Sequence, residues 1–163
     1  MSLLSFCEWL GKTSGSTAIH ESLLMYPLIE SVHVLTLCLF VGVIMMWDLR
    51  LMGVTLRSVP VSEMSARVLP WAVAGFIIMT ISGGLLVYQD PVRAYKSVLF
   101  RAKLAMLILA GLNALIFHVT IGRDLAGWDA DPVVPTRAKI AGGVSLTLWT
   151  CIIVAGRLIA YTI

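Results

Sequence analysis

PLIESVHVLTLCLFVGVIMMW occupies residues 27–47 and is followed directly by Asp-Leu-Arg. A helix of this length is about 30 Å long, which matches the hydrocarbon thickness of a bilayer. Glu30 and His33 lie near its start, three positions apart, and therefore on neighbouring faces of the helix. Ionisable side chains at that depth are costly and tend to mark a functional site. The stretch is therefore a predicted membrane span and the first candidate for chemistry.

The composition leaves little room for a soluble domain. Of the 163 residues, 59% are hydrophobic and 13% are charged, against about a quarter charged in ordinary domains. Four long apolar stretches, at about 27–47, 70–88, 98–121 and 139–161, account for most of the chain. We therefore expect an all-α integral membrane protein in which residues 1–163 form a single membrane domain, a bundle of four transmembrane helices.

The first 19 residues are expected to lie outside the bilayer core. A short interfacial helix is predicted because apolar residues recur there at helical spacing, namely Leu3, Leu4, Phe6, Trp9 and Leu10. Residues 11–19, GKTSGSTAI, are typical of a linker. The segment lacks the basic region of a cleavable signal peptide, so we expect the first span to be an uncleaved anchor.

The other apolar stretches carry two helix-packing signals. The second has small residues that predict a closely packed surface, namely Ala72, Ala74, Gly75, Ser82, Gly83 and Gly84. On the third, Lys103, Met106 and Asn113 fall within about 80° of arc and so share one face. The connection 51–69 is expected to be amphipathic, with a helix start near Ser62.

The charge pattern limits the possible binding partners and indicates the orientation in the membrane. The net charge is +3, and no basic cluster suggests nucleic acid. The three cysteines form no CxxC pair and are interpreted as apolar packing residues. Four spans place both termini on one side of the membrane. Basic residues are almost equal on the two sides, and a small excess favours a cytoplasmic position for the 48–69 and 122–138 connections.

The topology predicts that polar residues of three helices converge at the end of the bundle that carries the termini. They are Glu30, His33, Lys103, Arg157 and Tyr161. A structural alternative exists for each charged or imidazole group. Lys103 and Arg157 can extend to the interface, Glu30 can neutralise Arg157, and His33 can be a hydrogen-bonded packing residue.

The opposite end carries a smaller polar set, namely Asp48, Arg50, Asn113, His118 and the methionines Met45, Met46 and Met52. Asp48 and Arg50 are interpreted as an interfacial charge pair. The first and third helices run parallel, so His33 and His118 are separated by most of the membrane. They cannot be the two axial ligands of one iron within a subunit, and His118 would belong to a second site.

Three stretches carry a resemblance to known proteins. They are IESVHVLTLCLFVGVIMMWDLRL, RVLPWAVAGFIIMTISGGLLVY and FRAKLAMLILAGLNALIFHVTIGR. On these, the chain resembles the superfamily of small four-helix bacterial membrane proteins that includes HemJ-type protoporphyrinogen oxidases and CopD-like copper proteins. It also resembles, over almost its whole length, a group of bacterial inner-membrane proteins that share its ExxH, DLRL and N-x4-H elements.

The HemJ resemblance implies a b-type haem held near His33 in the bacterial inner membrane. Lys103 is then the matching basic residue, and His118 matches the family's third-helix histidine. HemJ-type proteins continue the first histidine helix into an aromatic and Arg-rich end, where this chain has VGVIMMWDLRLMG. This difference argues against porphyrinogen oxidation but not against haem binding. Whether the protein is an enzyme stays open.

The first functional hypothesis is a haem b redox protein that transfers electrons between quinol or a periplasmic partner and a substrate. His33 would bind iron as the metal ligand, with Lys103 or Met106 near the other face and Tyr161 beside the cofactor. Glu30 would supply a proton route, and Arg157 would pair with a haem propionate.

Two alternatives belong to other classes. Copper binding or transport would use soft ligands, namely His33, His118, Met45, Met46, Met106 and Cys38. A cofactor-free subunit of a larger membrane complex would use the charged residues only to fix helix register. The small-residue helices make a homo-oligomer a further expectation.

Overall fold

The computed structural model describes residues 2–125, 127, 134–159 and 161. The described part of the chain is helical and contains no strand. Four helices are long and apolar enough to cross a membrane, namely α3 (Met25–Leu51), α4 (Val61–Gln89), α6 (Val98–Ile116) with the π-helical turn η1 (Phe117–Ile121), and α8 (Thr136–Ile159). The predicted all-α four-span architecture is confirmed, and the chain is a multi-pass membrane protein.

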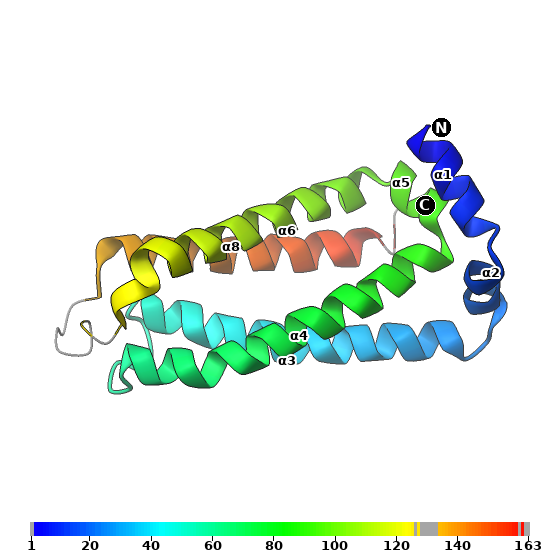
Figure 1. Cartoon of the computed structure of the whole chain (residues 1–163). Helices are drawn as coiled ribbons and strands as arrows, with labels where there is room; N and C mark the ends of the chain where they lie inside the picture. The colour runs from blue at the N-terminus through cyan, green and yellow to red at the C-terminus, as the bar shows by residue number, and fades with distance from the viewer. Residues whose placement is uncertain (1, 126, 128–133, 160, 162–163) are drawn as a thin grey trace.

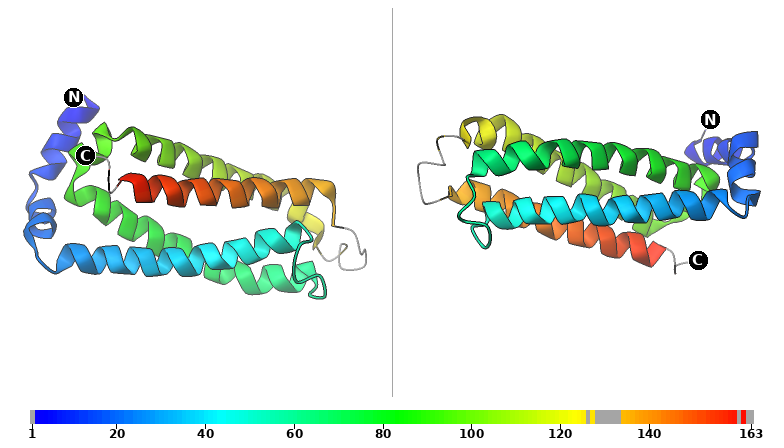
Figure 2. Two further views of the ribbon diagram at one scale, coloured as in Figure 1. Left: turned by 180° about the vertical axis from the view of Figure 1, so that it is seen from behind. Right: turned by 90° about the horizontal axis from the view of Figure 1, so that it is seen from below.

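The four long helices form two pairs, α3 with α4 and α6 with α8 (Figure 1). Contact between the pairs is made by α3 and α8. Within the described residues, no Cα atom of α4 lies within 8 Å of one in α6 or α8. Toward the end that carries α1, α2 and α5, α3 diverges from α6 and α8, whereas α4 leaves α3 and rises toward α5 (Figures 1 and 2). α3 is therefore the helix that joins the two halves of the bundle.

Two short helices precede the first span. α1 (Leu3–Gly11) confirms the predicted N-terminal helix, and it exposes Phe6 and Trp9. The predicted linker at 11–19 is wrong from residue 14, where α2 (Ser14–Glu21) begins. The Ser16 hydroxyl donates to the carbonyl of Tyr88 at 2.8 Å, and Ser16 is buried. Packing against the end of α4 thus orders a segment whose Gly and Ser content is typical of a linker.

α4 begins at Val61, well before the span predicted to start at Pro70. The helix start expected near Ser62 is therefore confirmed, but the helix continues through Pro70 into the apolar stretch. Pro70 has no N–H to donate to the preceding turn, which weakens the helix there. Val61 and Met64 are buried, and this burial holds the first turn of α4 in place. α5 (Pro91–Lys96) then links α4 to α6, capped by the Asp90 carboxylate, which accepts from the backbone N–H of Arg93 at 3.1 Å.

The core consists of two buried apolar clusters. The first joins the two pairs at mid-bundle and contains Phe40, Val41, Ala110, Trp149 and Ile152. In it, the rings of Phe40 and Trp149 meet edge to face with centroids 4.9 Å apart, a favourable aromatic geometry. The second contains Leu51, Val61, Phe117, Ala138 and Ala141, and it closes the bundle at the end of α3.

The closest approach of α3 and α8 occurs at Gly142. A Cβ atom on Gly142 would lie 2.9 Å from the backbone carbonyl oxygen of Asp48 and 3.3 Å from Cβ of Leu51. The neighbouring Gly143 has no atom within 4 Å of its Cβ position. The close helix crossing therefore requires a glycine at position 142 but not at position 143.

Gly142→Ala is expected to destabilise the folded protein by about 1–3 kcal/mol, because the added methyl group meets backbone that cannot move aside. Gly143→Ala is the matched control. It is expected to be neutral or to stabilise by up to about 1 kcal/mol, because alanine favours the helix. Thermal unfolding of the detergent-solubilised variants measures both effects. Equal changes in the two variants would contradict the crossing geometry.

Candidate functional site

His33 lies on α3 and contacts α4 through a hydrogen bond. Its Nδ1 lies 2.8 Å from the hydroxyl oxygen of Ser82. The imidazole packs over Gly83, where a Cβ atom would lie 3.2 Å from His33 Cε1. Ser82 is buried and His33 is partly exposed. The Ser-Gly step in α4 thus supplies both a hydrogen-bond partner and room for the ring.

The hydrogen bonds of Ser82 assign the tautomer of His33. The Ser82 hydroxyl lies 2.7 Å from the carbonyl oxygen of Ile78, one turn earlier in α4, and it can only donate there. A hydroxyl has one proton, so both short contacts are satisfied when the Nδ1–H of His33 donates to Ser82. Nε2 is then the unprotonated nitrogen, and its lone pair is available.

No hydrogen bond joins Nε2 of His33 to any residue that the structure describes. This nitrogen is also not sealed inside the protein. A neutral imidazole with one nitrogen held by a protein group and the other free is the arrangement found in metal-bound histidines. His33 therefore has the chemistry of a metal ligand or a proton acceptor.

Lys103 approaches from the other helix pair. Its Nζ lies 3.3 Å from where a Cβ atom of Gly156 would be, so the lysine of α6 lies over a glycine of α8. Its charge acts on the His33 imidazole of α3. Of the five residues predicted to converge, His33 and Lys103 therefore lie within electrostatic range of each other.

The face predicted to be shared by Lys103, Met106 and Asn113 is the face of α6 that packs on α8. Met106 packs against the first buried cluster. The Asn113 amide donates to the carbonyl of Ala141 at 3.0 Å. The shared face is confirmed, and Met106 is part of the core packing on that face.

Arg157, Tyr161 and Glu30 have partners of their own. Nη2 of Arg157 donates to the Tyr161 hydroxyl at 2.6 Å, and the guanidinium lies 5.0 Å from the centroid of the same ring. Glu30 interacts with Tyr26, one turn earlier on α3. No salt bridge joins Glu30 to Arg157 in the described structure. These three predicted site residues are thus not gathered around His33 by direct contacts.

The soft ligands of the copper hypothesis are dispersed. His118 lies in η1, at the opposite end of the bundle from the start of α3, and it is exposed with its ring 5.6 Å from that of Phe117 (Figure 1). Met45, Met46 and Cys38 are also exposed. Among the described residues, no group of three His, Cys, Asp or Glu side chains is close enough to hold one metal ion.

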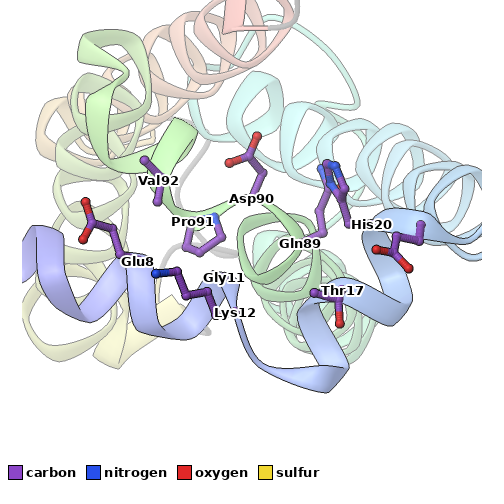
Figure 3. Close-up of a pocket in the computed structure, with 10 residues that line it drawn as sticks. Glu8, Gly11, Lys12, Thr17, His20, Gln89, Asp90, Pro91 and Val92 are labelled. Atoms are coloured by element: carbon purple, nitrogen blue, oxygen red, sulfur yellow. The ribbon is translucent and has the colours of Figure 1, made fainter.

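A polar surface cavity of about 430 Å³ lies where α1 and α2 meet the end of α4 and the start of α5 (Figure 3). Its charged and imidazole groups are Glu8, Lys12, His20, Glu21 and Asp90. His20 is exposed there. This cavity is lined by α1, α2, α5 and the last residue of α4, and His33 is not among its lining residues.

Two features of the site were not identified as functional from the sequence. Ser82 and Gly83 were predicted only as packing residues, although a hydroxyl within an apolar span is a detectable signal. Asp48 and Arg50 were interpreted as a charge pair, and this is wrong. The two are two residues apart on a helix, no salt bridge joins them in the described structure, and the Arg50 Nε–H donates to the carbonyl of Val59 at 2.9 Å.

The fold and the His33 site define a four-span, all-α membrane protein with a histidine held between two helices. The chain belongs to the family described as "Family of unknown function (DUF6644)", which matches residues 2–162. Comparisons with curated proteins and with solved structures returned no match. The resemblance to HemJ-type and CopD-like proteins therefore stays a prediction.

The tautomer of His33 is directly measurable. In ¹⁵N-histidine-labelled protein, NMR should show one histidine with Nδ1 protonated, and Ser82→Ala should remove that preference because the acceptor is lost. Thr80→Ala is the matched control, because among the described residues the Thr80 hydroxyl donates only to the carbonyl of Phe76 on the same helix. A wild-type His33 protonated at Nε2 would contradict the assignment.

Proposed function

We propose that the protein is a membrane-embedded haem b-binding redox protein in which Nε2 of His33 would bind the haem iron. The observation that carries this proposal is the fixed tautomer of His33, with Nδ1 donating to Ser82 and Nε2 free. Haem-binding histidines need that nitrogen unprotonated and the ring held in one orientation. The hydrogen bond to Ser82 would do both.

In this proposal the chain would supply a single ligand to the haem. Gly83 leaves room for the His33 ring on the α4 side. Met106 is packed in the core and supplies no second axial ligand in this arrangement. When bound, the haem would supply a one-electron redox couple whose potential depends on its ligand and on local burial.

Lys103 is the cation best placed to pair with a haem propionate. It is partly buried and its charge already acts on His33, whereas Arg157 is engaged by Tyr161. An ammonium group within an apolar bundle needs a counter-charge, and the described salt bridges provide none for Lys103. A propionate would supply that counter-charge. Glu30, exposed one turn before His33, is proposed to exchange protons at the membrane surface.

The proposed setting follows from the same residues. Electrons would pass between quinol or a periplasmic redox partner and the haem, in the bacterial inner membrane. The exposed apolar faces of the four spans contact lipid or further copies of the chain, so a homo-oligomer or a subunit of a larger complex belongs to the proposal. Whether the redox step is enzymatic depends on the substrate.

The direct test is the absorption spectrum of protein purified in detergent, with metal analysis of the same sample. Wild-type protein should show a Soret band and about one iron per chain. His33→Ala should lose the band, because the only proposed ligand is gone. His118→Ala is the matched control and should keep it, because His118 is exposed at the other end of the bundle.

Other outcomes of this experiment would overturn the haem proposal in a defined way. Copper without a Soret band would favour the copper hypothesis. A colourless, metal-free sample that still forms a defined assembly would favour a structural subunit. A Soret band that depends on His118 and not on His33 would place the haem at the other end.

The packing of the His33 ring over Gly83 supplies a second test. Gly83→Ala should weaken haem binding by about tenfold or more, the size typical when the surroundings of a metal-bound histidine are disturbed. The reason is that its methyl group would lie 3.2 Å from His33 Cε1. Gly84→Ala should leave binding unchanged, since nothing lies within 4 Å of that position. Haem titration of the reconstituted variants measures the difference, and equal affinities would count against His33 as ligand.

A further inference from the structure

Asp48 is a carboxyl group buried at the crossing of α3 and α8. Its side chain is only 2% exposed, and it lies at the opposite end of the bundle from the candidate haem site. Apolar residues of the second buried cluster, including Leu51, Phe117 and Ala141, surround this end of the bundle. Gly142 brings the backbone of α8 directly against the carbonyl of Asp48. The carboxyl is therefore buried at a closely packed helix crossing.

One oxygen of this carboxyl group has no partner. Oδ2 of Asp48 is fully buried and accepts no hydrogen bond from any described residue. Among the described residues, the Ser145 hydroxyl of α8 interacts with this carboxyl. Because Oδ2 has no partner, we infer that Ser145 faces Oδ1. A carboxylate anion needs donors for both oxygens, and leaving one bare inside a protein is strongly unfavourable.

No cation compensates Asp48 among the residues that the structure describes. On its own helix, the guanidinium Nε–H of Arg50 is directed to the carbonyl of Val59. On α4, Arg67 is exposed and paired with Glu63 at 2.5 Å. The other described cations and imidazole at this end are also exposed, namely Arg57, Arg123, Arg137, Lys139 and His118. None of them forms a salt bridge with Asp48.

We propose that Asp48 is a proton-binding site, occupied by a proton in the structure described. The proton would lie on the oxygen that faces Ser145 and be donated to the Ser145 hydroxyl oxygen. Oδ2 would then be the carbonyl oxygen of a neutral acid, for which the lack of a donor is tolerable. Release of the proton would leave an uncompensated charge at the α3–α8 crossing, which couples proton loss to loosening of that interface. The proposal is independent of haem binding.

The test is infrared spectroscopy of the purified full chain at neutral pH. Wild-type protein should show the carbonyl stretching band of a protonated carboxylic acid, and ¹³C-labelling of aspartate should shift it. Asp48→Asn should remove the band. Asp90→Asn is the matched control and should keep it, because Asp90 is outside the bundle and its carboxylate caps α5. The amide introduced by Asp48→Asn mimics the neutral acid, so this variant should also keep its thermal midpoint.

Ser145→Ala is the second variant, and it tests the proposal even if Asp48→Asn does not fold. It should keep the acid band but move it to higher frequency, because the hydrogen bond from the acid is lost. A wild-type protein without an aspartic acid band would overturn the proposal and indicate an ionised Asp48 that binds a cation. A band insensitive to both Asp48→Asn and Ser145→Ala would also overturn it.

Discussion

The close crossing of α3 with α8 is the constraint on which the rest of the bundle depends. In the described structure α3 is the helix of its pair whose backbone comes close to α8, whereas α4 reaches the other pair only through side chains such as Val61. Gly142 allows the backbones to touch at one end, and Phe40 packs on Trp149 further along. At the opposite end α3 diverges from α6 and α8 (Figure 1). The proposed haem site lies on this part of α3, away from the crossing, and binding sites are commonly found where packing is less dense.

This geometry explains why the polar residues of the spans divide into two groups with different chemistry. At the open end, His33 and Lys103 come from different pairs, are partly exposed, and have groups without partners among the described residues. At the closed end, Asp48 is sealed into apolar packing with a bare oxygen. The first arrangement suits a bound cofactor, and the second suits a bound proton. The two sites share α3, which would carry any mechanical coupling between them.

The sequence predicted the spans well because the length and hydropathy of a membrane helix are local properties. It predicted the shared face of Lys103, Met106 and Asn113 for the same reason, since helical periodicity is local. It did not predict the partner of His33, because Ser82 is far along the chain and was one of several small residues in α4. It predicted a charge pair between Asp48 and Arg50 because the two are close in sequence. The environment of Asp48 is instead set by the close approach of α8 to α3 at Gly142. α2 was missed because its order comes from contact with Tyr88, which its composition does not reveal.

The most direct measurement of the central claim is hyperfine spectroscopy of the oxidised protein labelled with ¹⁵N-histidine. We predict that one histidine nitrogen is coupled to the iron and that this coupling disappears in His33→Ala. The coupling should survive in His20→Ala, which changes an exposed residue of α2. Iron with no coupled histidine nitrogen, or a coupling that persists without His33, would contradict the assignment of His33 as the axial ligand.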